Sequence, residues 1–286
     1  MPELALSPAL LMAEGTEWLG NAGVADARRQ ALRIWAELQG ISLGESLLTT
    51  GVVVDSRRAA LFREAIRRRA AGEPLPYVTG TVGFRHLTLQ IDRRALIPRP
   101  ETEGLVELLL QRIRKGTIVD VGTGSGCIAL SLAHEGEFAS IVALDSSADA
   151  LALARLNHEL IGSPRTVHFV RGDLGTAIAP GSLDAMISNP PYLMLSEYAN
   201  LDPSVRDWEP ALALKAGTDG MDQTTRLLQG GAAWVRPGGW AALELDCSRA
   251  NAAVSLAAGN GWHNVSLHLD LFGRERYLLA QRSDTR

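Results

Sequence analysis

The chain has 286 residues, of which 46% are hydrophobic, 21% charged and 5% aromatic, and its formal net charge is −4. This composition is typical of a globular protein and excludes a disordered chain, and the length suffices for one large domain and a smaller one. A mildly acidic chain does not hold duplex nucleic acid by bulk electrostatics, so we expect no direct binding to nucleic acid.

Cysteine and histidine residues are too few or too scattered to indicate a disulfide framework or a metal site. Two cysteines, Cys127 and Cys247, cannot supply a disulfide framework or a thiolate metal site, and the six histidines are scattered. We therefore expect no bound metal. The N-terminus lacks the features of a signal peptide, and no stretch is apolar enough to span a membrane, so we expect a cytoplasmic protein without a membrane partner.

Residues 1–72 are predicted to form a helical domain. Apolar residues recur at helical spacing over 31–38 and 59–66, and Gly40 and Gly72 stand where helices are expected to end. A strand-like triplet, Val52-Val53-Val54, is very short. Six arginines crowd one predicted helix, and such a run is more often a solvated surface than a site for an acidic partner or RNA: Arg57, Arg58, Arg63, Arg67, Arg68 and Arg69.

Residues 73–100 are predicted to be a connector with a β-hairpin. The connector begins with Gly72-Glu73-Pro74-Leu75-Pro76, a segment rich in turn-forming residues. Apolar and polar residues then alternate over 84–91, which indicates a pair of short strands. Pro98-Arg99-Pro100 ends the connector.

Residues 101–286 alternate between strand and helix patterns, which predicts an α/β domain with a mostly parallel sheet and helices on both faces. Two clear helical stretches are 148–160 and 222–235. Seven strands are expected, at 117–121, 140–144, 166–170, 185–188, 240–245, 265–269 and 277–280. Ligands of such sheets bind at the carboxyl ends of the strands.

A glycine-rich loop follows the first of these strands, as Asp120-Val121-Gly122-Thr123-Gly124-Ser125-Gly126. Glycines permit a tight turn and a close approach of ligand to backbone. A dinucleotide fingerprint has Gly-x-Gly-x-x-Gly, whereas the glycines here are spaced two apart. The carboxylate of Asp120 suits a ligand with an ammonium and a sulfonium better than a pyrophosphate. The loop therefore predicts S-adenosylmethionine, bound by Asp120, Gly122, Thr123, Gly124, Ser125 and Gly126.

Two further acids follow the next two strands. Asp145 can accept hydrogen bonds from both ribose hydroxyls, and Asp173 can accept one from an adenine amino group while Leu174 packs on the ring. Either acid alone could instead cap the following helix. Acids at three successive strand ends beside the glycine loop favour the cofactor interpretation.

The fourth strand ends in Ser188-Asn189-Pro190-Pro191-Tyr192. The prolines could simply end a strand, with the tyrosine filling a cleft. The alternative is catalytic: the Asn189 side-chain oxygen and the Pro190 carbonyl accept hydrogen bonds from a planar NH2 group, and Tyr192 stacks on it. Pro191 is expected to contact the substrate, and Asn189 the cofactor as well. Alignment and stabilisation of the charge developing on nitrogen would promote methyl transfer. The acceptor could be a glutamine side chain, adenine N6 or cytosine N4.

With these motifs, the chain resembles the release-factor glutamine methyltransferases of the PrmC/HemK family over about residues 72–282. The more specific segments are 97–103 (Ile-Pro-Arg-Pro-Glu-Thr-Glu) and 208–210 (Trp-Glu-Pro). Segments 76–80, 217–220 and 270–276 are also similar to the family. At 244–247, Glu-Leu-Asp-Cys stands where the family usually has Glu-x-Gly and a later glutamine.

The resemblance implies a class I (Rossmann-like) methyltransferase domain and a small N-terminal helical domain that helps to grip a protein substrate. It implies N5-methylation of the glutamine in the Gly-Gly-Gln loop of peptide chain release factors. Arg99 and Glu101 are candidates for positioning either the substrate or the cofactor carboxylate. The main alternative is an N6-adenine or N4-cytosine methyltransferase, which would want a basic recognition region that the sequence lacks. A nicotinamide-dependent oxidoreductase and a non-catalytic binding module are weaker alternatives.

Overall fold

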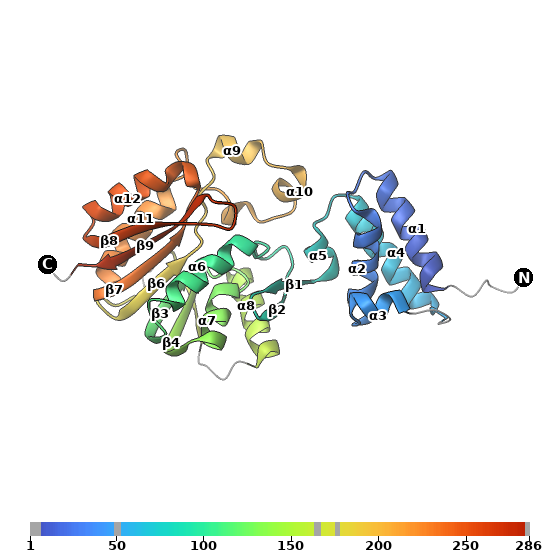
Figure 1. Ribbon diagram of the computed structural model, residues 1–286, viewed down its shortest axis with the longest axis horizontal. Coiled ribbons are helices and arrows are strands. Elements are labelled where there is room, and N and C mark those ends of the chain that lie inside the picture. Colours follow the sequence, from blue (N-terminus) through green and yellow to red (C-terminus); the bar gives the residue numbers. More distant parts are fainter. Residues whose placement is uncertain (1–6, 49–52, 163–166, 175–177, 284–286) are drawn as a thin grey trace, which may run out of the picture. The chain divides into compact units, whose positions relative to one another are not determined.

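The structure is a computed structural model that describes residues 7–48, 53–162, 167–174 and 178–283 (Figure 1). Within these residues the chain divides into two compact units. One contains the chain up to Thr81 together with Pro203–Trp208, and the other contains Val82–Asp202 and Glu209–Arg286. We call them the helical unit and the sheet unit.

The helical unit is held together by apolar residues that recur at helical spacing. Ile34 and Trp35 of α2 pack against Phe62 and Ile66 of α4, and the rings of Trp35 and Phe62 meet edge to face at 5.7 Å. Gly15 of α1 lies against Phe62, where a Cβ would come within 2.8 Å of the ring. The helices are α1 (Pro8–Asn21), α2 (Ala27–Gln39), α3 (Leu43–Leu48), α4 (Ser56–Ala70), α5 (Leu75–Thr79) and α10 (Pro203–Arg206).

Val53 and Val54 of the strand-like triplet do not form a strand. Val54 is buried in the helical core, and Asp55 caps α4 by accepting a hydrogen bond from the amide of Arg58 at 2.8 Å. Packing and capping here outweigh the β-propensity of valine. Val52 lies outside the described residues.

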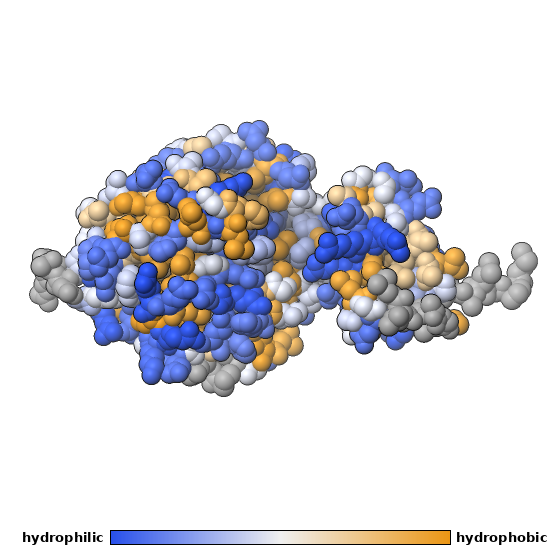
Figure 2. Space-filling model, in the orientation of Figure 1, coloured by the Kyte–Doolittle hydropathy of each residue, from blue (hydrophilic) through white to orange (hydrophobic). Residues whose placement is uncertain are grey.

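The arginine run of α4 is largely paired within the helical unit. Arg63 binds Glu14 at 2.7 Å, Arg68 binds Glu73 at 2.6 Å, and Arg69 donates to Gln30 at 2.7 Å. These neighbours favour the interpretation of the run as a solvated surface. Figure 2 shows strongly hydrophilic side chains gathered in a band on the visible face of the helical unit, and hydrophobic side chains gathered in patches on the visible face of the sheet unit.

The sheet unit contains a seven-stranded sheet in the order β5-β4-β3-β6-β7-β9-β8, in which β9 runs opposite to the other six strands. The prediction of a seven-stranded, mostly parallel sheet is thus confirmed. Thr166, at the start of one predicted strand, lies outside the described residues. The strands are β3 (Lys115–Val121), β4 (Glu137–Asp145), β5 (Val167–Arg171), β6 (Leu183–Ser188), β7 (Val235–Glu244), β8 (Trp262–Leu269) and β9 (Glu275–Arg282).

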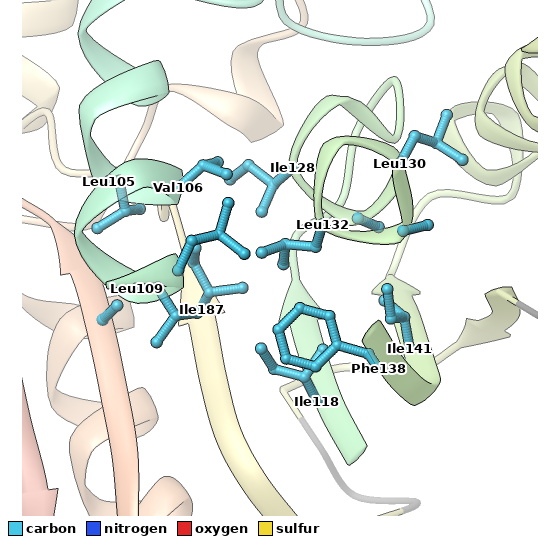
Figure 3. Close-up of a cluster of buried hydrophobic side chains, with 14 of the residues drawn as sticks. Leu105, Val106, Leu109, Ile118, Ile128, Leu130, Leu132, Phe138, Ile141 and Ile187 are labelled. Atoms are coloured by element: carbon cyan, nitrogen blue, oxygen red, sulfur yellow. The ribbon is translucent and has the colours of Figure 1, made fainter. Parts of the chain in front are cut away.

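Alternate residues of each central strand enter two separate cores. Ile118 of β3 faces the core of α6 (Pro100–Leu110) and α7 (Cys127–Glu135), drawn in Figure 3, whereas Val119 faces the core of α11 (Asp222–Trp234) and α12 (Ala250–Gly259). Burial on both faces explains why these strands are almost continuously apolar. Helix α8 (Ala148–Ile161) follows β4, and a separate hairpin is formed by β1 (Thr81–Phe84) and β2 (Leu87–Gln90). A short helix, α9 (Leu195–Ala199), follows β6.

The sheet register brings the predicted site residues to one edge. Val121 lies beside Leu144, Asp145 beside Arg171, and Asp120 beside Ile187. The chain passes from β3 outward through β4 and β5 and then resumes on the other side of β3 with β6. This reversal of strand order is where open α/β sheets bind ligands.

Candidate active site

The loop after β3 has a backbone conformation that favours glycine. The φ angles of Gly122, Gly124 and Gly126 are +75°, +56° and +85°. A residue with a Cβ would be strained at these angles. The Gly122 amide donates to the Leu144 carbonyl at 2.8 Å, and the Gly124 amide donates to the Asp145 carboxylate at 2.9 Å. The loop is therefore fastened to the end of β4.

Asp120 is fully buried beneath this loop. Its Oδ2 accepts hydrogen bonds from the Thr123 hydroxyl at 2.7 Å and the Ala129 amide at 3.1 Å, whereas Oδ1 has no partner in the described part of the chain. Burial raises the pKa of Asp120 to about 7. A nearby cation would favour the ionised form, so this carboxylate suits a positively charged ligand.

Asp145 holds two backbone amides at the end of β4. Its Oδ1 accepts from Ser147 at 2.8 Å, and its Oδ2 accepts from Gly124. The cap of α8 is Ser147, whose hydroxyl accepts from the Ala150 amide at 3.2 Å, so Asp145 is not the helix cap. Each carboxylate oxygen keeps a lone pair that can accept a ribose hydroxyl.

Asp173 and Leu174 follow β5. The Asp173 side chain is 63% exposed and pairs with Arg226 of α11 at 2.7 Å. The predicted adenine contact therefore has a competing cation, although the carboxylate can accept further hydrogen bonds. Leu174 has a φ of +44°, a left-handed conformation that is unusual for leucine.

A cleft of about 200 Å³ lies at this edge of the sheet. Several predicted site residues line it: Gly122, Gly124, Asp145, Asp173, Leu174, Asn189 and Pro191. Other predicted residues lie outside the described lining: Asp120, Thr123, Ser125, Gly126, Pro190, Tyr192, Arg99 and Glu101. The loop members Thr123 and Ser125 are buried, so they support the loop from behind.

The sequence interpretation missed much of the cleft wall. The connector contributes residues 94–96, the start of α8 contributes Ser147 and Ala150, and the loop before α11 contributes Leu212. None of these positions belongs to a charged or glycine-rich motif with a chemical signature. From the sequence, these positions could be assigned to the cleft only because they adjoin elements that end at the same edge of the sheet.

Asn189 stands directly after β6 and is held from one side. Its Nδ2 donates to the Thr102 hydroxyl at 3.0 Å, and that hydroxyl donates to Glu244 Oε2 at 2.7 Å. The Asn189 Oδ1 accepts no hydrogen bond from any residue that the structure describes. Since Asn189 lines the cleft, this oxygen is available to a ligand there. Thr102 and Glu244 were not predicted to belong to the site.

Tyr192 is half-buried, and burial raises the pKa of its hydroxyl to about 12. The nearby carboxylate of Glu244 acts in the same direction. The ring is therefore neutral over the physiological range and suited to stacking rather than to proton transfer.

Arg99 and Glu101 lie at the start of α6. Arg99 binds Glu209 at 2.6 Å, and the other oxygen of Glu209 accepts from the Ile97 amide at 3.1 Å. Glu209 is buried and thus fastens the connector to the loop before α11. The backbone carbonyl of Glu101 accepts a hydrogen bond from the hydroxyl of Tyr277. Both positions therefore hold the elements around the cleft.

The sheet order, the glycine loop and the cleft define a class I methyltransferase. The model of the methyltransferase small domain matches residues 100–200, and that of the PrmC N-terminal domain matches residues 11–80. A crystal structure of a methyltransferase from Pyrococcus furiosus has the same fold, with a TM-score of 0.53 and 18% identity, covering 80% of this chain and 100% of that one.

Curated relatives identify the family. A release factor glutamine methyltransferase of Deinococcus radiodurans is 38% identical over 96% of this chain and 98% of its own length. One from Nitratidesulfovibrio vulgaris is 39% identical over 83% of this chain and 82% of its own length. The chain belongs to the release factor glutamine methyltransferase family. The similarity extends through the N-terminal helices, beyond the segment over which the motifs were recognised.

Proposed function

We propose that this protein transfers a methyl group from S-adenosylmethionine to the side-chain amide nitrogen of a glutamine in a peptide chain release factor. The observation that carries the proposal is the fixed Asn189 amide: its nitrogen donates to Thr102, and its oxygen, at the cleft, accepts from no residue in the described ranges. Membership of the family supports the glutamine as acceptor and the release factor as substrate.

The residues present fit S-adenosylmethionine. A Cβ on Gly122 would meet no atom within 4 Å, so the loop leaves open space there for a ligand. Asp120 offers a buried carboxylate oxygen that has no partner among the described residues, which suits a cationic ligand, and Asp145 offers lone pairs to ribose hydroxyls. We propose that Leu174 packs on the adenine. When bound, the cofactor supplies a methyl group activated by the sulfonium.

The chain's own task is to orient a weak nucleophile. The lone pair of an amide nitrogen is delocalised into its carbonyl, so the NH2 group must be held and stabilised as positive charge develops on it. We propose that Asn189 Oδ1 and the Pro190 carbonyl accept its two protons and that Tyr192 stacks on the amide plane. Alignment of this kind contributes several kcal/mol to a transfer reaction.

The same acceptors fit adenine N6 and cytosine N4, so the partner must be argued separately. The chain is acidic overall, and the arginines of α4 are largely engaged within the helical unit. Neither property supports a nucleic-acid substrate. No helix in the described ranges has the length and apolar character that a membrane crossing needs. Because release factors act on ribosomes, we propose that the reaction occurs in the cytoplasm.

Methyl-labelled S-adenosylmethionine tests the proposal. The purified protein is incubated with label and, in separate reactions, an unmethylated release factor, duplex DNA or RNA. We expect label only in the release factor. Label in nucleic acid and none in the release factor would contradict the proposed substrate.

A further inference from the structure

Two consecutive hydrogen bonds link Asn189 to Thr102 and Thr102 to Glu244, and each donor points toward Glu244; we call them the hydrogen-bond chain. Asn189 Nδ2 donates to Thr102 Oγ1, and Thr102 Oγ1 donates to Glu244 Oε2. We propose that Thr102 and Glu244 are positioning residues that hold the oxygen of the Asn189 amide, and not its nitrogen, toward the substrate. The inference rests on the proposed function, because it concerns how Asn189 meets an NH2 group.

The three residues of the hydrogen-bond chain come from α6, from the end of β6 and from β7. Ser188 of β6 lies beside Leu243 of β7, so Asn189, directly after β6, follows next to Glu244, the last residue of β7. Thr102, in the first turn of α6, bridges them. Thr102 is 2% exposed and Glu244 is 1% exposed, so water does not compete for these hydrogen bonds.

The single proton of the threonine hydroxyl gives the chain its direction. An ionised Glu244 can only accept hydrogen bonds, so Thr102 must donate to it. The threonine oxygen then presents lone pairs to Asn189, which binds them through Nδ2. With the amide turned over, two donor groups would face each other at the cleft, and the substrate NH2 would lose an acceptor.

Protonation of Glu244 would remove this direction. Burial raises the pKa of Glu244 to about 7; its hydrogen bond from Thr102 and the charges of Arg276 and Arg99 oppose that shift, and Glu101 adds to it. Tyr192, Tyr277 and Cys127 also lie near this carboxylate, and burial raises the pKa of each to about 12, so all three are neutral at physiological pH. A protonated Glu244 can donate to Thr102, and the threonine hydroxyl can then either accept from Asn189 Nδ2 or donate to Asn189 Oδ1, so both orientations of the amide become possible. Turnover should therefore fall as the pH drops below about 7.

Substitution of Thr102 tests the positioning role directly. Thr102→Val keeps the shape and removes the hydroxyl, so we expect kcat on a release factor to fall by about 100-fold. The dissociation constant for S-adenosylmethionine, measured by calorimetry, should change much less than kcat, because the glycine loop and Asp145 do not bind Thr102. Thr102→Ser should restore most of the turnover. Thr224→Val in α11 is the matched control, since Thr224 is also buried and lies in the core on the other face. A Thr102→Val enzyme with wild-type kcat would overturn the inference.

Glu244→Gln supplies a second measurement if the valine variant does not fold. Glutamine has both a donor and an acceptor, like a protonated glutamate, and it does not titrate. The variant should therefore show, at every pH, about the low kcat that the wild type has on the acid side. The decrease of kcat on the acid side should then be present in the wild type and absent in the variant. An unchanged acid limb in Glu244→Gln would overturn the inference. If the wild-type protein does not methylate the release factor at all, the proposed function itself fails, which is a different result.

Discussion

The buried carboxylate of Asp120 lowers the stability of the ligand-free protein, and a bound cation would offset this effect. Its carboxylate is fully buried, and one oxygen has no partner among the described residues. Burial of such a group without full hydrogen bonding is unfavourable. A positively charged ligand on the other side of the glycine loop would stabilise the ionised form. We therefore infer that Asp120 lowers the stability of the free protein and strengthens the binding of a cationic ligand.

The pH dependence of stability tests this interpretation of Asp120. Its folded pKa of about 7 lies above the ordinary value of 3.8, so the folded protein takes up a proton between these pH values. The resulting stabilisation is present at low pH and is lost as the pH rises through 7. In Asp120→Asn this dependence should vanish. Relative to wild type, the variant should gain about 1–4 kcal/mol in unfolding free energy between pH 4 and pH 8.

Urea unfolding at the two pH values measures this difference, with no cofactor present. Parallel unfolding curves, in which the two proteins differ by the same amount at both pH values, would contradict the raised pKa. The same variant should bind S-adenosylmethionine more weakly in calorimetry, because it lacks the negative charge.

Asn189→Asp separates an acceptor oxygen from an oriented amide. The aspartate keeps oxygen atoms at the cleft, yet it has no Nδ2 proton to donate to Thr102, whose hydroxyl is already committed to Glu244. Two acceptors would face each other. We expect kcat to fall by about 100-fold or more, as when one stabilising group is removed from other active sites. Single-turnover transfer to a release factor measures the effect, and near-normal turnover would refute the assigned role.

At the scale of elements, the start of α7 depends on Gly126. Its φ is +85°, and a Cβ there would lie 3.1 Å from Leu130 and 3.2 Å from Ala154. Gly126→Ala should lower the unfolding free energy by about 1–3 kcal/mol through backbone strain and crowding. Gly162→Ala is the matched control, because Gly162 also has a positive φ, whereas no atom of the described residues lies within 4 Å of a Cβ built there. Equal losses in both variants would show that crowding against α8 contributes nothing.

The elements that the sequence predicts best are the buried strands. Their apolar runs must lie between two layers of helices, as Ile118 and Val119 do on opposite faces of β3. Their ends were less predictable. For example, β7 begins at Val235, five residues before the predicted strand, and includes Pro237, Gly238 and Gly239. Pairing of Val235 with Leu183 of β6 sustains the strand through residues that discourage it locally.

Contacts between distant segments set the limit of prediction at the site. The glycine loop and Asn189 have local signatures that arise from backbone conformation and chemistry. Thr102 and Glu244 are separated by 142 residues, and Arg99 and Glu209 by 110. These residues act as pairs, and only the fold brings the partners together. The motif around Thr102 was recognised by resemblance, whereas the role of its hydroxyl required the structure.

At the scale of the whole molecule, the charge is consistent with a protein substrate. The net charge is −4, so the chain has no overall excess of basic residues. Duplex DNA binding depends on neutralising many phosphates with a basic surface. A protein loop that inserts one glutamine side chain into a cleft has no such requirement. The identity of the methylated atom therefore distinguishes a protein substrate from a nucleic-acid substrate.

Mass spectrometry of the reacted release factor tests that point most directly. The protein is incubated with S-adenosylmethionine and an unmethylated release factor, and the products are digested and fragmented. We predict one added methyl group on the side-chain amide of the Gly-Gly-Gln glutamine. A matched release factor with that glutamine replaced by glutamate should gain none. A methyl group on any other residue, or equal methylation of the glutamate variant, would contradict the account.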